Sequence, residues 1–139
     1  MSVQPSQDAF SVRVQDENLP RTEVVEILLK LSSAQLTARD LISERVRAEC
    51  DRLLVDIKGA LAPFLIRPTD EEIALNGDPR ERKIPMNPEN RVKTALEAFE
   101  SNGFILLVDD IQIESLDQEI KMTPTSVVTF LKLTPLVGG

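Results

Sequence analysis

The sequence contains no histidine, no tryptophan and no tyrosine, and its 139 residues include a single cysteine, Cys50. Without histidine, the common zinc sites and the Ser-His and Cys-His catalytic pairs cannot be built. Without Trp and Tyr, the usual aromatic platforms for stacking bases or sugars are absent. One cysteine cannot form a disulfide within the chain. These absences exclude many enzyme classes, although chemistry based on the 23 Asp and Glu remains possible. We expect a protein that is not an enzyme and that binds no metal.

The charge of the chain is predominantly acidic, with 23 Asp and Glu against 16 Lys and Arg and a net charge of -7. This charge argues against nucleic acid or an anionic membrane as a partner and favours a protein partner with a basic face. No apolar run approaches the roughly 18 residues of a membrane-spanning helix, and the N-terminus does not resemble a signal peptide. We therefore expect a cytoplasmic protein with no membrane or nucleic-acid partner.

The composition is that of a folded globular protein, with 42% hydrophobic and 28% charged residues. A chain of this length predicts one domain with its own core. The polar, unpatterned residues 1–9 are expected to form a flexible lead, residues 10–133 the domain, and residues 134–139 an extended C-terminal tail.

The N-terminal part of the domain predicts a β-hairpin. Phe10, Val12 and Val14 alternate with polar residues, which is the period of a half-buried strand. Turn-forming residues at 16–21 are expected to end this strand, and a second strand at 24–31 then places its apolar residues at alternate positions.

A helix is predicted to follow from Thr37, whose hydroxyl can cap the first turn with Asp40 three residues later. Apolar residues then recur at helical spacing, at Ala38, Ile42, Val46, Cys50 and Leu53. Charged residues, Arg45 among them, are expected on the opposite, solvated face. Because Cys50 falls on the apolar stripe, we expect a small core residue rather than a reactive thiol.

The middle of the chain, residues 59–87, is irregular and contains four prolines. Phe64–Ile66 predicts a short strand, and Asn76-Gly77 predicts a turn. The basic residues Arg80, Arg82 and Lys83 alternate with acids or stand near proline, which favours a solvated loop over a docking patch.

The C-terminal third predicts a second helix and further strands. Asn87-Pro88 is a strong helix start, and Asn102-Gly103 is a typical helix end. The continuous apolar run at 104–108 predicts a central strand that is buried on both faces. A short strand is expected at 111–116, a polar connection at 117–124, and a last strand at 126–133.

The order of hairpin, helix and later strands resembles the β-grasp fold of ubiquitin-like proteins. The resemblance is most specific near the end, where the residues are spaced like the closing segment of the molybdopterin-synthase small subunit and the thiamine sulfur carrier. These residues are Leu107–Asp110, Ile113, Leu116-Asp117, Val127–Leu131 and the tail Pro135-Leu136-Val137-Gly138-Gly139. The resemblance implies an α+β fold with a mixed sheet around one main helix. The second helix then belongs to an insertion at about 59–103. Because of this insertion, the chain is more similar to the larger prokaryotic ubiquitin-like modifiers than to the compact sulfur carriers.

The same resemblance implies that the tail carries the chemistry. In such a modifier an activating enzyme consumes ATP to adenylate the Gly139 carboxylate, and the modifier itself holds no cofactor. A conjugating-enzyme cysteine then takes the acyl group and a target amine receives it, while a deconjugating protease reverses the step. Gly138 and Gly139 lack a β-carbon that would obstruct a narrow channel, and Pro135, Leu136 and Val137 are the expected recognition segment. Such bacterial conjugation systems include ones that act in antiviral defence.

Two alternatives and one further surface remain open from the residues alone. The first alternative is a sulfur carrier with a C-terminal thiocarboxylate, and the second is a non-covalent β-grasp adaptor. The last strand is also expected to offer a partner-docking face, formed by Phe130 and Lys132 or by Leu131 and Leu133, depending on which face is buried.

Overall fold

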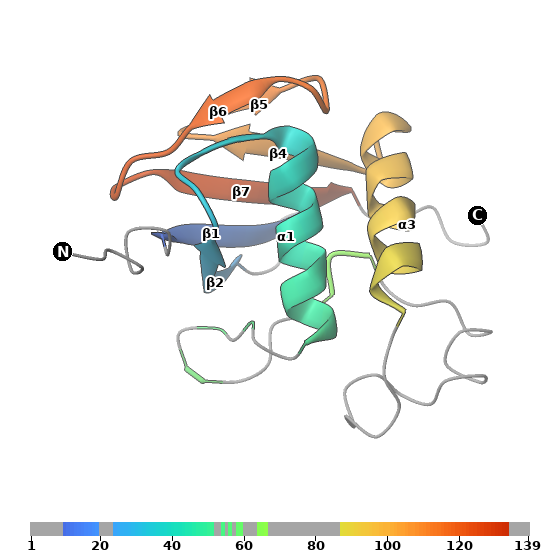
Figure 1. Cartoon of the computed structure of the whole chain (residues 1–139), viewed down its shortest axis with the longest axis horizontal. Coiled ribbons are helices and arrows are strands. Elements are labelled where there is room, and N and C mark those ends of the chain that lie inside the picture. Colours follow the sequence, from blue (N-terminus) through green and yellow to red (C-terminus); the bar gives the residue numbers. More distant parts are fainter. Residues whose placement is uncertain are drawn as a thin grey trace, which may run out of the picture.

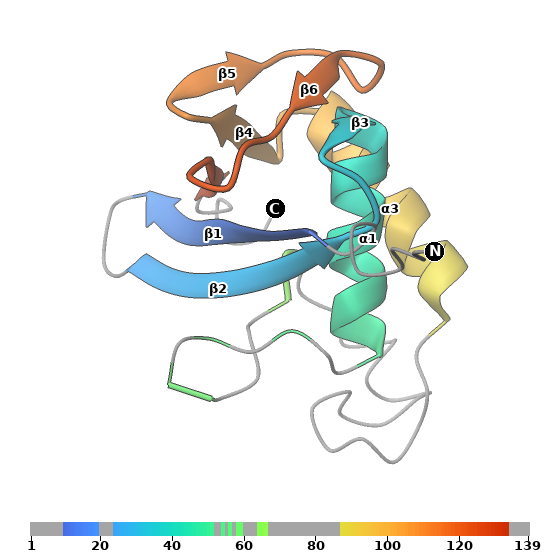
Figure 2. The same cartoon turned by 60° about the vertical axis from the view of Figure 1, so that its left-hand side comes forward.

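The described residues form a mixed β-sheet that carries two helices on one face (Figures 1 and 2). The computed structural model describes residues 10–19, 24–51, 54, 56, 58–59, 64–66 and 87–133. The expected N-terminal lead, the turn at Asn76-Gly77, the basic residues at 80–83 and the tail at 134–139 lie outside the described residues.

The elements follow the predicted order, with two added strands. They are β1 (Phe10–Leu19), β2 (Val24–Leu31), β3 (Gln35–Thr37), α1 (Ala38–Cys50), α3 (Pro88–Glu100), β4 (Phe104–Val108), β5 (Ile111–Ile113), β6 (Glu119–Lys121) and β7 (Val127–Leu133). β3 and β6 were not predicted, and they form a separate two-stranded antiparallel sheet. Three residues per strand are too few for hydrophobic alternation to stand out from a loop.

The main sheet has the strand order β2-β1-β7-β4-β5. β1 pairs with β2 as an antiparallel hairpin and with β7 in parallel, whereas β4 is antiparallel to both β7 and β5. This α+β architecture confirms the expected mixed sheet with two helices and is compatible with a β-grasp plan. Within the described residues, no helix is long and apolar enough to span a bilayer.

Both helices begin at the predicted caps. The Thr37 side chain accepts a hydrogen bond from the amide of Asp40 at 3.2 Å, and the Asp40 carboxylate accepts one from the amide of Thr37 at 3.3 Å. The Asn87 side chain accepts from the amides of Glu89 and Asn90 ahead of α3. Because each cap satisfies amides that have no partner within the helix, it sets where the helix starts.

The core lies between the helices and the inner face of the sheet. Phe99 of α3, Phe104 of β4 and Phe130 of β7 form a chain of tilted rings, with successive centroids 5.9 and 5.8 Å apart. Phe130 is completely buried. α1 and α3 pack side by side over this core (Figure 1).

Three local predictions were wrong. β1 continues through the segment expected to be a turn, and Asp16 lies on its buried face. Phe64–Ile66 is a bend and not a strand. β4 is fully buried on one face only, since Ile105 and Leu107 on the other face are half-buried.

Candidate functional site

The most specific polar arrangement in the described chain is a buried charge network between β1, β7 and α1. Its centre is Arg45, whose side chain is fully buried although the sequence placed it on a solvated face. Arg45 donates two hydrogen bonds to the carboxylate of Asp16, at 2.5 and 2.7 Å. Its Nε donates a third, to Glu49 one helical turn further on, at 2.8 Å. We call Asp16, Arg45, Glu49 and Lys132 the buried charge network.

The network is neutralised internally, which is what allows charged groups to be buried. Lys132 of β7 supplies the second positive charge, with its Nζ 3.7 Å from Oδ2 of Asp16. The guanidinium carbon of Arg45 also lies 4.8 Å from the centroid of the Phe130 ring. A cation over an aromatic face in this position gains a further electrostatic attraction.

The electrostatics of the network follow from burial and pairing. Burial alone lowers the pKa of Arg45, but the Asp16 and Glu49 carboxylates more than offset it and leave that pKa raised. Burial raises the pKa of Glu49 above its ordinary value, against the opposing effect of Arg45. Burial likewise lowers the pKa of Lys132, against the opposing effect of Asp16. In each case, the charged partner opposes the effect of burial on the pKa.

The network also holds a piece of the irregular middle segment. The amide of Leu65 donates to Oε2 of Glu49 at 2.8 Å, and Nζ of Lys132 donates to the carbonyl oxygen of Phe64 at 3.3 Å. Arg91 of α3 donates to the carbonyl of Ile66 and lies over the Phe64 ring. The backbone of residues 64–66 is thus hydrogen-bonded to side chains of α1, α3 and the end of β7.

The predicted docking face on Phe130 and Lys132 needs correction. Phe130 is 0% exposed, and Lys132 points to the same inner face, where it contacts Asp16 and Phe64. Alternate residues of a strand point to opposite faces, so the other pair, Leu131 and Leu133, belongs to the outer face. Both are half-buried.

The outer face of the sheet carries an apolar strip next to the end of β7. Leu131 is directly paired with Ile105 of β4, and Leu107 lies two residues along β4 on the same face. We call Ile105, Leu107, Leu131 and Leu133 the outer strip. Both described helices lie on the opposite side of the sheet (Figure 2).

Cys50, the only cysteine, is half-buried and packs against the core, as its place in the apolar stripe predicted. Burial, followed by the nearby charge of Glu49, raises the pKa of its thiol to about 11. Such a thiol is almost entirely protonated at neutral pH. In the part of the chain that the structure describes, no three potential metal-binding side chains converge.

The residues predicted to carry the chemistry, Gly138 and Gly139, and the recognition residues Pro135, Leu136 and Val137 lie outside the described residues. The structure describes the strand that precedes these residues in the sequence, and this strand ends at Leu133. Comparison with known proteins adds no assignment, since no protein-family model, curated protein or solved structure matches the chain.

Proposed function

We propose that this chain is a ubiquitin-like protein modifier with a β-grasp domain, in which Gly139 provides the carboxylate that becomes attached to target amines. The observation that carries the proposal is the position of β7. This strand lies in the middle of the sheet, runs parallel to β1, and ends at Leu133, with four residues between it and Gly138-Gly139.

The sheet topology supports the proposal independently of the glycines. An N-terminal hairpin is followed by α1 across the sheet, and the last strand enters between β1 and β4. The order of hairpin, helix and later strands along the chain is the one that we expected of a β-grasp domain. α3 then corresponds to the proposed insertion, and it packs beside α1 without displacing any strand of the main sheet.

The chemistry proposed for the tail requires enzymes other than this chain. The Gly139 carboxylate attacks the α-phosphate of ATP, which forms an acyl-adenylate and releases pyrophosphate. A conjugating-enzyme thiolate then attacks the acyl carbon, forming a thioester and releasing AMP. A target lysine amine finally displaces the thiol and leaves an isopeptide bond. The two glycines contribute by having no side chain to obstruct these transfers.

The outer strip supplies the recognition surface in this proposal. Leu131 and Leu133 are apolar and face away from the core, and they lie on the strand that leads into the tail. An enzyme that bound the strip would therefore hold the domain close to the residues that react. Binding energy gained at such a remote contact helps to position the reacting group.

The test is reconstitution with the cognate activating and conjugating enzymes. We expect the protein ending at Gly139, incubated with ATP and these enzymes, to give higher-mass conjugates that contain an isopeptide bond. Deletion of Gly138-Gly139 should abolish the conjugates, whereas the matched tail change Thr134→Ala should retain them. Unchanged conjugation after the deletion would refute the proposal.

Intact mass in the same reactions separates the alternatives. A persistent gain equal to the exchange of one oxygen for sulfur, with no conjugate, would assign the chain as a sulfur carrier. Stable binding of the partner enzymes without any covalent change would assign a non-covalent adaptor.

A further inference from the structure

The main sheet has two edge strands of very different length. The strand order β2-β1-β7-β4-β5 leaves β2 at one edge and β5 at the other (Figure 2). β2 has eight residues, whereas β5 has three. An edge strand presents a row of N–H and C=O groups that can pair with a further strand. β2 is therefore the longer template for such pairing.

The outer edge of β2 is paired at one position in the described chain. Asp56 forms an isolated antiparallel bridge with Ile27. Among the residues that the structure describes, no other residue pairs with this edge, and residues 28–31 have a strand partner only on the β1 side. Most of the strand edge thus has no described partner.

The exposed large hydrophobic side chains of the described residues all lie on the two edge strands. They are Val24 and Leu28 of β2, 45% and 60% exposed, and Ile111 of β5, 66% exposed. A single exposed aliphatic side chain is ordinary on a protein surface. Three such side chains confined to strand edges instead indicate that an edge is a place where another strand packs.

The charges around Leu28 are arranged symmetrically. Glu26 stands two residues before it and Lys30 two residues after it, and alternate residues of a strand share one face. Lys30 is exposed and has no ion-pair partner among the described residues. Glu26 pairs through Oε2 with Nε of Arg13 at 3.0 Å, which leaves its other oxygen for a second cation.

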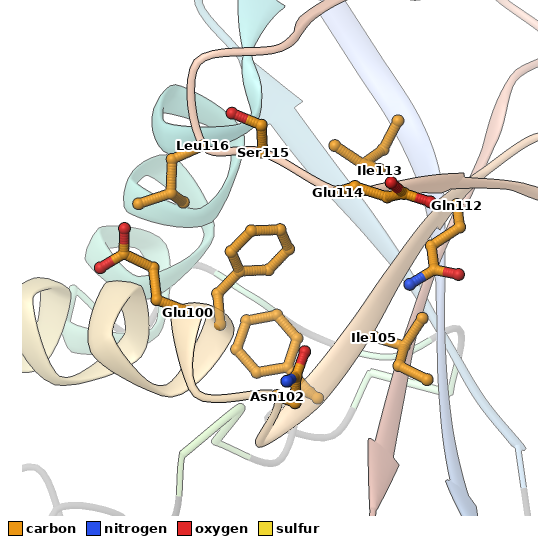
Figure 3. A pocket seen from close by; sticks show the side chains of 10 residues that line it. Glu100, Asn102, Ile105, Gln112, Ile113, Glu114, Ser115 and Leu116 are labelled. Carbon is orange, nitrogen blue, oxygen red and sulfur yellow. The ribbon is translucent and has the colours of Figure 1, made fainter.

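The surroundings of Ile111 at the opposite edge lack this symmetry. The positions two residues before and after it hold Asp109 and Ile113, which are not an opposite-charge pair. β5 also borders a hollow of about 470 Å³, with Gln112 and Glu114 in its lining (Figure 3). The shorter strand and the absence of complementary charges make β5 the weaker candidate for pairing.

We propose that β2 pairs antiparallel with β2 of a second copy of this chain, with Leu28 on the two-fold axis. In this register Leu28 faces its own copy, Glu26 faces Lys30 of the second copy, and Lys30 faces the second copy's Glu26. Directly opposite residues of an antiparallel pair lie on the same face and interact, so one apolar contact and two ion pairs form together. The contact uses the same surface on both copies, which closes a dimer and does not propagate. The proposal does not depend on the function proposed for the tail.

The pairing changes one contact of the present structure. Ile27 would pair with Leu29 of the second copy at the position where Asp56 now forms its bridge. A single bridge is thus exchanged for a ladder over residues 25–31 of both copies. The side chains of Ile27 and Leu29 stay on the buried face of their own sheet, so the core is not disturbed.

The first experiment measures the oligomeric state of the intact chain by sedimentation velocity, from micromolar to near-millimolar concentration. Physiological ionic strength screens the repulsion between two chains of net charge -7. We expect a monomer that converts to a dimer as the concentration rises. Amide hydrogen exchange at the same concentrations should slow at alternate residues of β2 and remain unchanged in β5. A chain that stays monomeric throughout, or a dimer whose β2 amides gain no protection, overturns the proposal.

A charge swap tests the register. Lys30→Glu places like charges opposite each other twice and should weaken the dimer at least about tenfold, and Glu26→Lys should do the same. An equimolar mixture of the two variants restores both opposite-charge pairs, so it should dimerise about as well as the unchanged chain. Misfolding of either variant would not be rescued by mixing. Lys121→Glu makes the same charge change at an exposed strand position away from β2 and should leave dimerisation unchanged. A mixture that stays monomeric, or a control that weakens the dimer equally, refutes this register.

The apolar contact has its own matched pair of variants. Leu28→Thr keeps a residue that favours strands but removes most of the apolar surface at the two-fold axis, and it should weaken the dimer by about three- to tenfold. Ile111→Thr makes a comparable change at the other edge of the sheet, at a side chain that is at least as exposed. Dimerisation should be unaffected by this second variant. Equal weakening by both variants would contradict pairing through β2.

Discussion

Replacement of Arg45 by methionine tests whether the buried charge network is held together by its central guanidinium. Arg45 contacts both Asp16 and Glu49, through three hydrogen bonds of 2.5 to 2.8 Å. The variant retains a long apolar side chain but leaves two carboxylates, both nearly inaccessible to water, facing each other. Only Lys132, at 3.7 Å from Asp16, would still offset their charge.

We expect Arg45→Met to have a much lower free energy of unfolding than the unchanged protein at neutral pH. Removal of one partner from a buried ion pair costs about 3–5 kcal/mol because an uncompensated charge is left in a medium of low polarity. Urea unfolding followed by circular dichroism at 222 nm measures the free energy of unfolding without needing a tryptophan, which this chain lacks. At pH 7.5 we expect Arg45→Met to lower that free energy by about 3–5 kcal/mol.

The loss of free energy of unfolding should be smaller in acid than at neutral pH. The direction of this change follows from the pKa of Glu49. Burial already raises the pKa of Glu49, and Arg45 is the main group that opposes this rise. A carboxyl whose folded pKa is raised contributes its full stability below the unfolded pKa and loses it as pH rises through the folded pKa. In the variant the opposing group is gone, so the folded pKa rises further. The deficit in the free energy of unfolding should therefore be smaller at pH 5.5 than at pH 7.5.

Two further variants keep this prediction falsifiable. Arg39→Met removes a cation of the same helix whose pair with Asp117 is exposed, at 3.3 Å, and it should cost less than about 1 kcal/mol. The triple variant Asp16→Asn, Arg45→Met, Glu49→Gln removes the guanidinium together with both carboxylates that it contacts, leaves Lys132 in place, and should recover much of the loss at pH 7.5. A deficit that is the same at both pH values, or a triple variant no more stable than Arg45→Met, would refute the reasoning.

Three smaller predictions concern single side chains. With its pKa raised to about 11, Cys50 should react with iodoacetamide at pH 8 roughly a hundredfold more slowly in the folded protein than in urea, and a folded rate close to the unfolded one would contradict that burial effect. Thr37→Ala removes the capping box of α1 and should lower the free energy of unfolding by about 1 kcal/mol. Asn87→Ala removes the acceptor for two amides of α3 and should cost a similar amount, about 1 kcal/mol, in the same urea titration. No loss in either cap variant would mean that the helix starts are fixed by tertiary packing alone.

Local signals in the sequence predicted the regular elements well. The caps at Thr37 and Asn87 start α1 and α3, and the left-handed residue expected at the end of the second helix is Asn102, with a φ of 65°. These signals act within one turn of the chain, so no knowledge of the tertiary fold is needed to interpret them. The sequence likewise predicted β1, β2 and β7 from their alternation, although it ended β1 too early.

The buried charge network was missed because charge was interpreted as exposure. Asp16 continues the alternation of Val12 and Val14, and Arg45 stands three residues after Ile42, so both occupy positions that face the core. Opposite charges at the core-facing positions of two amphipathic elements can therefore be used to predict a buried ion pair. Knowing which stripes meet, however, depends on the packing of α1 over β1, which lies 29 residues away along the chain.

The end of β7 links the buried charge network to the function that we propose. Lys132 is the last residue but one of β7, and it is fastened to β1 through Asp16 and to the middle segment through Phe64. Its neighbours Leu131 and Leu133 point the other way, into the outer strip. One face of the strand end therefore carries a charged contact, and the other carries half-buried apolar side chains. In the proposed function, an enzyme bound to the outer strip would contact the same strand from which the proposed reactive tail extends, which is how binding at one place can help to position a reacting group at another.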